Sequence, residues 1–278
     1  MTVIMRKEVI LSFMILMLLG CREEIPVVCP EVYTTTLEEL QQYGDSLMRN
    51  KVGAIVAIDP LNGEILAMVS APEADSGLPE KYHPGIDRCS EVDYPVGTLE
   101  VPPFDTWEGE LWVTPLQLAN ACVIIANQGL YYAPHTTKEV NEEGDPIGTL
   151  TLMDSGIAPE RFHKTIEEMW LSANSAPGEG GAGWIAHVDG LDVCAMPGKA
   201  RNSSGEYNSV FIGFAPKNRP RIAIAVYVEN GGEGASVAAP IGSLMIEKYL
   251  LGLTTRPDLE SRVMKWNYLN RGIYKEQP

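Results

Sequence analysis

The segment KVGAIVAIDPLNGEILAMVSAP, residues 51–72, decides the fold class of this 278-residue chain. Residues 54–58 are wholly apolar and rich in β-branched side chains, as in a strand that is covered on both faces. Residues 59–63 supply turn residues, and their Asn-Gly pair adopts positive φ at little cost. Residues 64–70 then return as a second strand. The segment therefore predicts an antiparallel β-hairpin.

Two more strands are predicted towards the C-terminus, at residues 209–215 and 222–229, joined by the turn residues of 216–220. Both are apolar on both faces, so we expect them to lie at the centre of a sheet. Apolar residues at helical spacing predict helices over residues 37–50 and 159–171. A last helix is predicted to begin at Pro240 and to stop at Gly252.

The clearest helix signal is TPLQLANACVIIANQGLYYAPH, residues 114–135. Thr114 suits the N-cap and Pro115 the first helical position, while Gly129 suits a left-handed end. The helix is apolar nearly all the way round, which predicts that it is buried.

The order of these elements predicts an α+β fold, an antiparallel sheet covered by helices. Residues 37–262 form the predicted domain, preceded by a tether over 21–36 and followed by a tail over 263–278. The chain is acidic, with 37 acidic and 21 basic residues and a formal net charge of −16. Such a chain offers few cations to phosphates, so we expect no nucleic-acid partner. The spacing of its four His and five Cys shows no metal-ligand pattern, and we expect no metal and no other cofactor.

The N-terminus predicts an export signal. Arg6 and Lys7 precede an apolar run over residues 10–19, which is too short to span a bilayer but suits a signal peptide over residues 1–20. The run ends in Leu-Leu-Gly-Cys, which resembles a bacterial lipobox, with Cys21 as the lipidated residue. This predicts a lipid-anchored protein of the bacterial cell envelope, and an ordinary signal peptide or an uncleaved anchor are the alternatives. Cys122 and Cys194 lie in apolar stretches and are expected to be buried free thiols.

Residues 51–72, 114–135 and 209–250 together resemble the transpeptidase domain of class B penicillin-binding proteins, most closely the penicillin-binding protein 2 type. The resemblance implies a penicillin-binding fold, and a role in peptidoglycan crosslinking. It extends over residues 37–262, and it implies that most of one helical subdomain is missing.

The resemblance also shows which catalytic positions are altered. The family places a Ser-x-x-Lys motif at the start of a helix, where the lysine one turn later can deprotonate the serine. Here the matching segment is YPVGTLEV, residues 94–101, with Thr98 at the serine position and Val101 at the lysine position. Glu100 is poorly placed as a substitute base, and Pro102 and Pro103 oppose a helix.

The other two motifs are altered as well. Only fifteen residues separate Thr98 from Thr114, too few for the subdomain that carries Ser-x-Asn, and Ser172-Ala173-Asn174 matches that motif in the wrong place. The family's Lys-Thr-Gly edge strand corresponds to PGKARNSS, residues 197–204. It keeps Lys199 but has Ala200 and Arg201 in place of threonine and glycine.

Three hypotheses follow. The first is a catalytically inactive, transpeptidase-like envelope protein that binds peptidoglycan or cell-wall synthesis proteins, with Lys199 and Arg201 as candidate substrate-binding residues. The second is a weakly active transpeptidase or carboxypeptidase, with Thr98 as nucleophile and Lys199 as its cationic partner. The third is a decaying paralogue, in which loss of the helical subdomain exposes apolar surface of the sheet.

Overall fold

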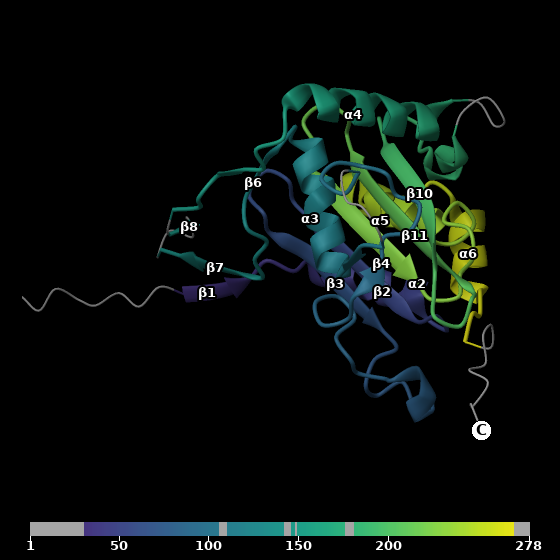
Figure 1. Ribbon diagram of the computed structural model, residues 1–278. Helices are drawn as coiled ribbons and strands as arrows, with labels where there is room; N and C mark the ends of the chain where they lie inside the picture. Colours follow the sequence, from purple (N-terminus) through teal and green to yellow (C-terminus); the bar gives the residue numbers. More distant parts are fainter. Residues whose placement is uncertain (1–30, 106–109, 142–145, 148, 176–180, 270–278) are drawn as a thin grey trace, which may run out of the picture.

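The centre of the computed structural model is a five-stranded antiparallel sheet in the order β10-β11-β12-β2-β3 (Figure 1). The structure describes residues 31–105, 110–141, 146–147, 149–175 and 181–269. The strands are β2 (Gly53–Ile58), β3 (Ile65–Ala71), β10 (Cys194–Arg201), β11 (Tyr207–Ala215) and β12 (Ile222–Val228). The predicted α+β fold class, an antiparallel sheet covered by helices, is confirmed.

The strands lie where their sequences predict. The hairpin of residues 51–72 forms β2 and β3, and every residue of β2 is buried. Every residue of β12 is buried too, and β11 and β12 occupy interior positions of the sheet. The edges are β3 and β10, so the strand in which the resemblance places the Lys-Thr-Gly position is an edge strand.

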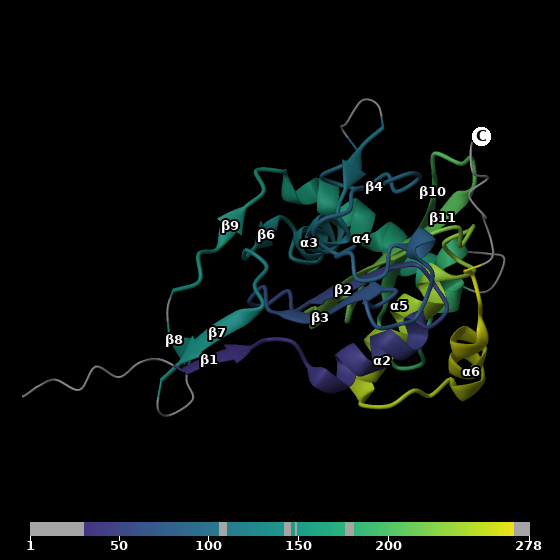
Figure 2. The ribbon, with the colours of Figure 1, turned by 90° about the horizontal axis from the view of Figure 1, so that it is seen from below.

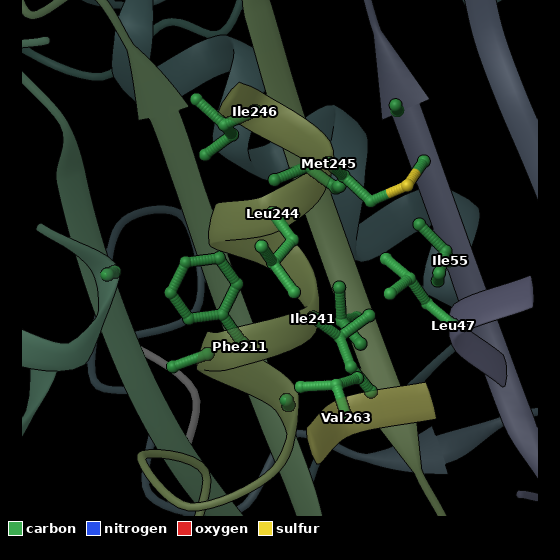
Figure 3. Close-up of a cluster of buried hydrophobic side chains, with 14 of the residues drawn as sticks. Leu47, Ile55, Phe211, Ile241, Leu244, Met245, Ile246 and Val263 are labelled. Atoms are coloured by element: carbon green, nitrogen blue, oxygen red, sulfur yellow. The ribbon is translucent and has the colours of Figure 1, made fainter. Parts of the chain in front are cut away.

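One face of the sheet is covered by α2 (Glu38–Met48), α5 (Ala238–Leu251) and α6 (Pro257–Lys265). Figure 3 shows Ile241 and Leu244 of α5 among Leu47, Phe211 and Val263, in one buried apolar cluster. A Cβ added to Gly242 would lie 2.4 Å from the ring of Phe211, so this glycine lets α5 approach β11 closely. The predicted stop at Gly252 is confirmed, because this residue caps α5 in the left-handed conformation.

The opposite face is covered by α3 (Pro115–Ala126) and α4 (Pro159–Asn174). Thr114 is the N-cap of α3, as predicted, and forms a capping box with Gln117. The Thr114 hydroxyl accepts the Gln117 backbone N–H at 3.2 Å, and the Gln117 side chain accepts the Thr114 N–H at 2.9 Å. Most residues of α3 are buried, as its apolar sequence predicts.

Short strands and 3-10 turns connect the layers. Within the described chain they are β1 (Glu31–Thr34), η1 (Glu80–Tyr82), β4 (Tyr94–Pro95), β5 (Trp112–Val113), β6 (Leu130–Tyr131), β7 (Thr137–Val140), β8 (Pro146–Ile147), β9 (Met153–Asp154) and η2 (Ala182–Ala186). β1, β7 and β8 form a small sheet beside the main body (Figure 2). The tether predicted over residues 21–36 is therefore too long, because its last residues pair with β7.

The domain boundary predicted at residue 262 is too early. Helix α6 continues to Lys265, and Val263 is fully buried against the sheet. Lys51 holds the end of this helix, because its buried ammonium donates to the carbonyls of Val263 at 2.9 Å, Arg49 at 3.1 Å and Trp266 at 3.4 Å. These carbonyls include groups that the end of α6 leaves without helical partners. Burial lowers the pKa of Lys51 to about 8.

Candidate functional site

Thr98, at the expected serine position, lies in a turn that follows β4 and not at the start of a helix. Its backbone N–H donates to the Lys199 carbonyl at 3.1 Å, and its Oγ1 accepts the Lys199 backbone N–H at 3.0 Å. These two hydrogen bonds attach Thr98 to the outer edge of β10. The threonine therefore occupies the strand edge to which an extended peptide would otherwise be added.

The positions around Thr98 offer it no general base. Val101, at the expected lysine position, is fully buried in the apolar cluster beneath α3, while Glu100 is exposed. The chain from Val101 to Asp105 forms turns, as the Pro102-Pro103 pair predicts. A hydroxyl nucleophile needs an adjacent base to lose its proton, and Thr98 has none among its hydrogen-bond partners in the described chain.

Lys199 is committed to another partner. Its ammonium lies 2.5 Å from Oε1 of Glu233 and 5.1 Å from the centre of the Tyr207 ring. The hydrogen bond and the charge of Glu233 raise the pKa of Lys199. The lysine stays protonated, but its charge is already paired with Glu233, which weakens its predicted role as the cationic partner of Thr98.

Small residues allow the Thr98 turn to lie against β10. Gly97 has φ +69°, and a Cβ there would lie 2.2 Å from the Lys199 carbonyl oxygen and 2.7 Å from the Ala200 Cβ. A Cβ on Gly198 would lie 2.8 Å from Leu99 and 3.2 Å from Thr98 Oγ1. Ala200 is buried beneath this turn. The space at the motif's threonine position is therefore filled by the chain itself.

The segment of residues 94–105, called the connecting segment below, covers the sheet where the helical subdomain is expected. Val96, Leu99 and Val101 are buried in the same cluster as α3. Its far end is fixed to α4, because Arg161 Nη2 contacts both carboxylate oxygens of Asp105, at 2.6 and 2.7 Å. The connecting segment thus covers this part of the sheet, which the decaying-paralogue hypothesis expects to be exposed.

A buried polar network supports the start of the connecting segment. Arg88, 3% exposed, donates to Glu229 at 3.2 Å and to the carbonyls of Tyr82 and His83 at 2.7 and 3.1 Å. The Tyr94 hydroxyl donates to the same Glu229 oxygen at 2.8 Å, and its ring stacks on Tyr227 at 4.1 Å. Burial and then Glu229 raise the pKa of Tyr94. Sequence reasoning missed this network, because no local pattern marks Arg88 as buried or pairs it with Glu229.

The remaining residues that the sequence singles out form hydrogen bonds within the local structure. Arg201 is exposed, and its Nε donates to the Gly205 carbonyl in the adjacent turn at 3.3 Å. Ser172 accepts the Gly183 backbone N–H at 3.1 Å, and Asn174 donates to the carbonyls of Trp170 and Val193 at 2.8 Å. The Ser172-Ala173-Asn174 match thus joins α4 to its neighbours and does not approach Thr98 through any hydrogen bond in the described chain.

The described cysteines are free and buried, as predicted for Cys122 and Cys194, and Cys89 is a third. Burial raises the pKa of Cys122 and of Cys194 to about 12, which makes both thiols unreactive. The predicted lipidation residue, Cys21, lies outside the described residues, as does Cys29. Within the described ranges no three His, Cys, Asp or Glu side chains are grouped to hold a metal ion. No helix there is long and apolar enough to cross a membrane.

Comparison with known families gives a match over residues 102–247, to the family described as penicillin binding protein transpeptidase domain. The match begins just after the altered segment 94–101. The D,D-transpeptidase MrdA of Acinetobacter baumannii is 30% identical over 164 residues, which cover 54% of this chain and 24% of MrdA. Penicillin-binding protein 2A of Bacillus subtilis is 28% identical over 204 residues, which cover 65% of this chain and 28% of that protein. The chain thus spans about a quarter of the length of these curated relatives.

Solved structures show the same fold. Penicillin-binding protein A of Mycobacterium tuberculosis, as a ceftriaxone acyl-enzyme complex, superposes with a TM-score of 0.65 at 19% identity, covering 80% of each chain. Pseudomonas aeruginosa PBP2 superposes with a TM-score of 0.65 at 20% identity, covering 80% of this chain and 79% of that one. At such identities the likeness shows the fold alone.

Proposed function

This chain belongs to the penicillin-binding protein transpeptidase family, and we propose that it serves peptidoglycan synthesis as a binding protein without acyl-transfer activity. Its partner in this proposal is peptidoglycan itself or a protein of the cell-wall synthesis machinery. The observation that carries the proposal is the pair of hydrogen bonds between Thr98 and the backbone of Lys199.

Two consequences of this geometry argue against catalysis. The only base in the family's serine motif is replaced by Val101, whose side chain is buried and carries no proton acceptor. The edge of β10 that would pair with an extended substrate is already paired with Thr98. A site that lacks both the base and the substrate edge has lost more than one member of a unit that acts together.

The decisive experiment is incubation of the purified full chain with a fluorescent penicillin, followed by denaturing electrophoresis and intact-protein mass spectrometry. We expect no covalent adduct, while an active class B penicillin-binding protein in the same assay is labelled. The Thr98→Ala variant is the matched control. An adduct that disappears in Thr98→Ala would refute the proposal and establish a threonine acyltransferase.

A second candidate keeps substrate contact without chemistry, with Lys199 and Arg201 holding a carboxylate of the peptide. The geometry favours it less, because Glu233 already neutralises Lys199 and Arg201 lies beside the β10–β11 turn. Co-sedimentation with purified peptidoglycan tests it, with Arg201→Ala compared against Arg219→Ala, which removes an equal charge from a different loop. Selective loss of sedimentation in Arg201→Ala would support it.

The envelope location is part of the proposal and rests on the sequence of residues 1–21. Metabolic labelling with an alkyne fatty acid in a bacterial host should label the chain, and Cys21→Ala should abolish the label. A labelled Cys21→Ala variant would contradict lipidation at this residue.

The decaying-paralogue alternative predicts a chain that does not unfold cooperatively. Its test is thermal unfolding of the soluble chain that begins at Arg22. A single sharp transition would argue against this alternative.

A further inference from the structure

The outer edge of β3 is protected at Met68 by a side chain and at Leu66 by a backbone N–H. Gln41 of α2 accepts the Met68 backbone N–H at 2.8 Å and donates to the Met68 carbonyl at 3.1 Å. The Leu66 carbonyl accepts the Leu37 N–H at 2.8 Å. One amide side chain thus takes the place of a neighbouring strand at Met68, which shields this part of the edge from added strands.

The protection ends at Ser70. In an antiparallel pair, every second residue directs its N–H and carbonyl away from its neighbour, so Ser70 faces the same outer side as Met68. No group in the described part of the chain takes the Ser70 backbone N–H or carbonyl in a hydrogen bond. Its hydroxyl is used elsewhere, because it donates to the Ile86 carbonyl at 2.7 Å and accepts the Arg88 N–H at 3.0 Å.

The free edge at Ser70 borders a cavity of about 420 Å³, between the end of α2 and the segment that follows β3. Figure 2 shows α2 alongside β3 at this side of the sheet. Buried Met48 and Val69 give the cavity an apolar floor, and Asp45 and Glu73 give it an acidic rim. The cavity therefore combines unpaired backbone groups with apolar surface and two carboxylates.

The two carboxylates repel each other and favour a cation between them. Burial, and after it the charge of Glu73, raises the pKa of Asp45, which a hydrogen bond from Gln41 offsets in part. Lys51 also borders the cavity, but its ammonium is directed to three carbonyls at the end of α6. Arg49 is exposed at the rim and has no side-chain partner in the described chain. Asp45 is half-buried and Glu73 is exposed, and neither forms an ion pair with a cation of the described chain.

We propose that the edge of β3 at Ser70 binds a short extended segment of a partner protein that carries a lysine or arginine. The backbone of this segment pairs with the Ser70 N–H and carbonyl, and its basic side chain lies against Asp45 and Glu73. The contact is short, because Pro72 has no N–H and its carbonyl already accepts the Gly85 N–H at 3.0 Å. Main-chain pairing supplies affinity in such complexes, and the side-chain pocket supplies specificity.

Fluorescence anisotropy with the full chain tests this proposal. The probe is a fluorescein-labelled, terminally blocked pentapeptide Thr-Val-Lys-Val-Thr, and its matched control has glutamate in place of lysine. We expect the lysine peptide to bind and the glutamate peptide to bind at least about tenfold more weakly, from the loss of two attractive ion pairs and the gain of repulsion.

Two double variants distinguish an effect of the carboxylates at the cavity from an effect of the overall charge of the protein. The double variant Asp45→Asn/Glu73→Gln should weaken binding of the lysine peptide about five- to tenfold. Asp75→Asn/Glu80→Gln, which removes two exposed carboxylates outside the cavity lining, should leave binding unchanged. Equal binding of the two peptides, no binding of either, or equal effects of the two double variants would overturn the proposal.

Amide hydrogen exchange gives a readout of the backbone pairing. Bound lysine peptide should slow exchange at Ser70, and a peptide N-methylated at its central residues should lose both the protection and the binding. A peptidoglycan stem peptide containing lysine serves as a competitor from a different source. Tighter binding of that stem peptide than of the pentapeptide would refute a protein segment as the occupant. None of these outcomes depends on whether Thr98 reacts with penicillin.

Discussion

The two faces of the sheet are closed in different ways. On the α5 face, three helices with apolar side chains cover the strands. On the other face, α3 and α4 leave a part of the sheet to the connecting segment, which has turns in place of a helix. The α5 face is closed by regular helices, whereas the connecting segment closes its part of the other face with turns and buried apolar side chains. The altered motif positions Thr98 and Val101 thus lie in a packed contact and not in an open cleft.

The largest loss of stability is expected when a lysine is placed at position 101, where the family motif has its lysine. Val101→Lys places an ammonium without a partner at a fully buried position, and we expect a loss of about 3–5 kcal/mol in the free energy of unfolding. Glu100→Lys, at the exposed neighbouring position, should change it by less than about 0.5 kcal/mol. Urea unfolding followed by circular dichroism measures both. Two equally stable variants would show that Val101 is not packed as described.

Gly97→Ala tests the close approach to β10. Gly77 is a matched control, because its φ of +68° equals that of Gly97 at +69° within a degree, while no atom lies within 4 Å of its added Cβ. Both substitutions strain the backbone, but only Gly97→Ala meets the Lys199 carbonyl and Ala200. We expect Gly97→Ala to destabilise the fold by about 2 kcal/mol more than Gly77→Ala, measured by urea unfolding. Equal losses would mean that the turn does not press against β10.

Thr98→Val removes the acceptor for the Lys199 backbone N–H while keeping the side-chain shape. The expected loss is about 1 kcal/mol in the free energy of unfolding. Faster amide exchange at Lys199 should accompany it. Thr151→Val, at an exposed position, is the control and should leave both quantities unchanged. Unaltered exchange at Lys199 in Thr98→Val would argue that this hydrogen bond does not form.

The pH dependence of the free energy of unfolding tests the burial of Lys51 on the α5 face. The folded pKa of Lys51, about 8, lies below the ordinary 10.5, so between these values the unfolded chain binds more protons. The free energy of unfolding should therefore gain an upward contribution as pH rises from about 8 towards 10.5. Lys51→Met should remove that contribution, and urea titrations across the pH series of both proteins would show it. Parallel pH profiles for the two proteins would contradict the lowered pKa.

The smallest effect is expected at Arg201. Its side chain is exposed and makes a long hydrogen bond to the adjacent turn, so Arg201→Ala should not shift the thermal midpoint measurably. This result would place Arg201 outside the packed contact between the connecting segment and β10. A clear loss of stability would include it in that contact.

Most of the fold was predictable because its signals are local. The Asn-Gly turn of the β2–β3 hairpin, the Thr114 cap and the Gly252 stop each act through neighbouring residues. The loss of the motif base was also visible, since Val101 cannot accept a proton in any fold. Local patterns do not predict which distant segments pair, such as Glu31–Thr34 with Thr137–Val140.

The same limit applies to the site. The letters of Gly97 and Ala200 do not reveal that they touch, because about a hundred residues separate them in sequence. Nor does the isolated Arg88 predict a partner at Glu229 on a strand end. Nor does the sequence show that the connecting segment covers the sheet, because its buried apolar residues follow no helical or strand period.

The contact between Gly97 and Ala200 also bears on the history open to this chain. A return to the family motif would require a threonine at position 200. The turn at Gly97 occupies the space that the threonine side chain would need. The substitution Ala200→Thr alone is therefore expected to lower the free energy of unfolding. A lysine at position 101 meets the same obstacle in the buried cluster. Packing around positions 101 and 200 therefore opposes each single substitution towards the family motif.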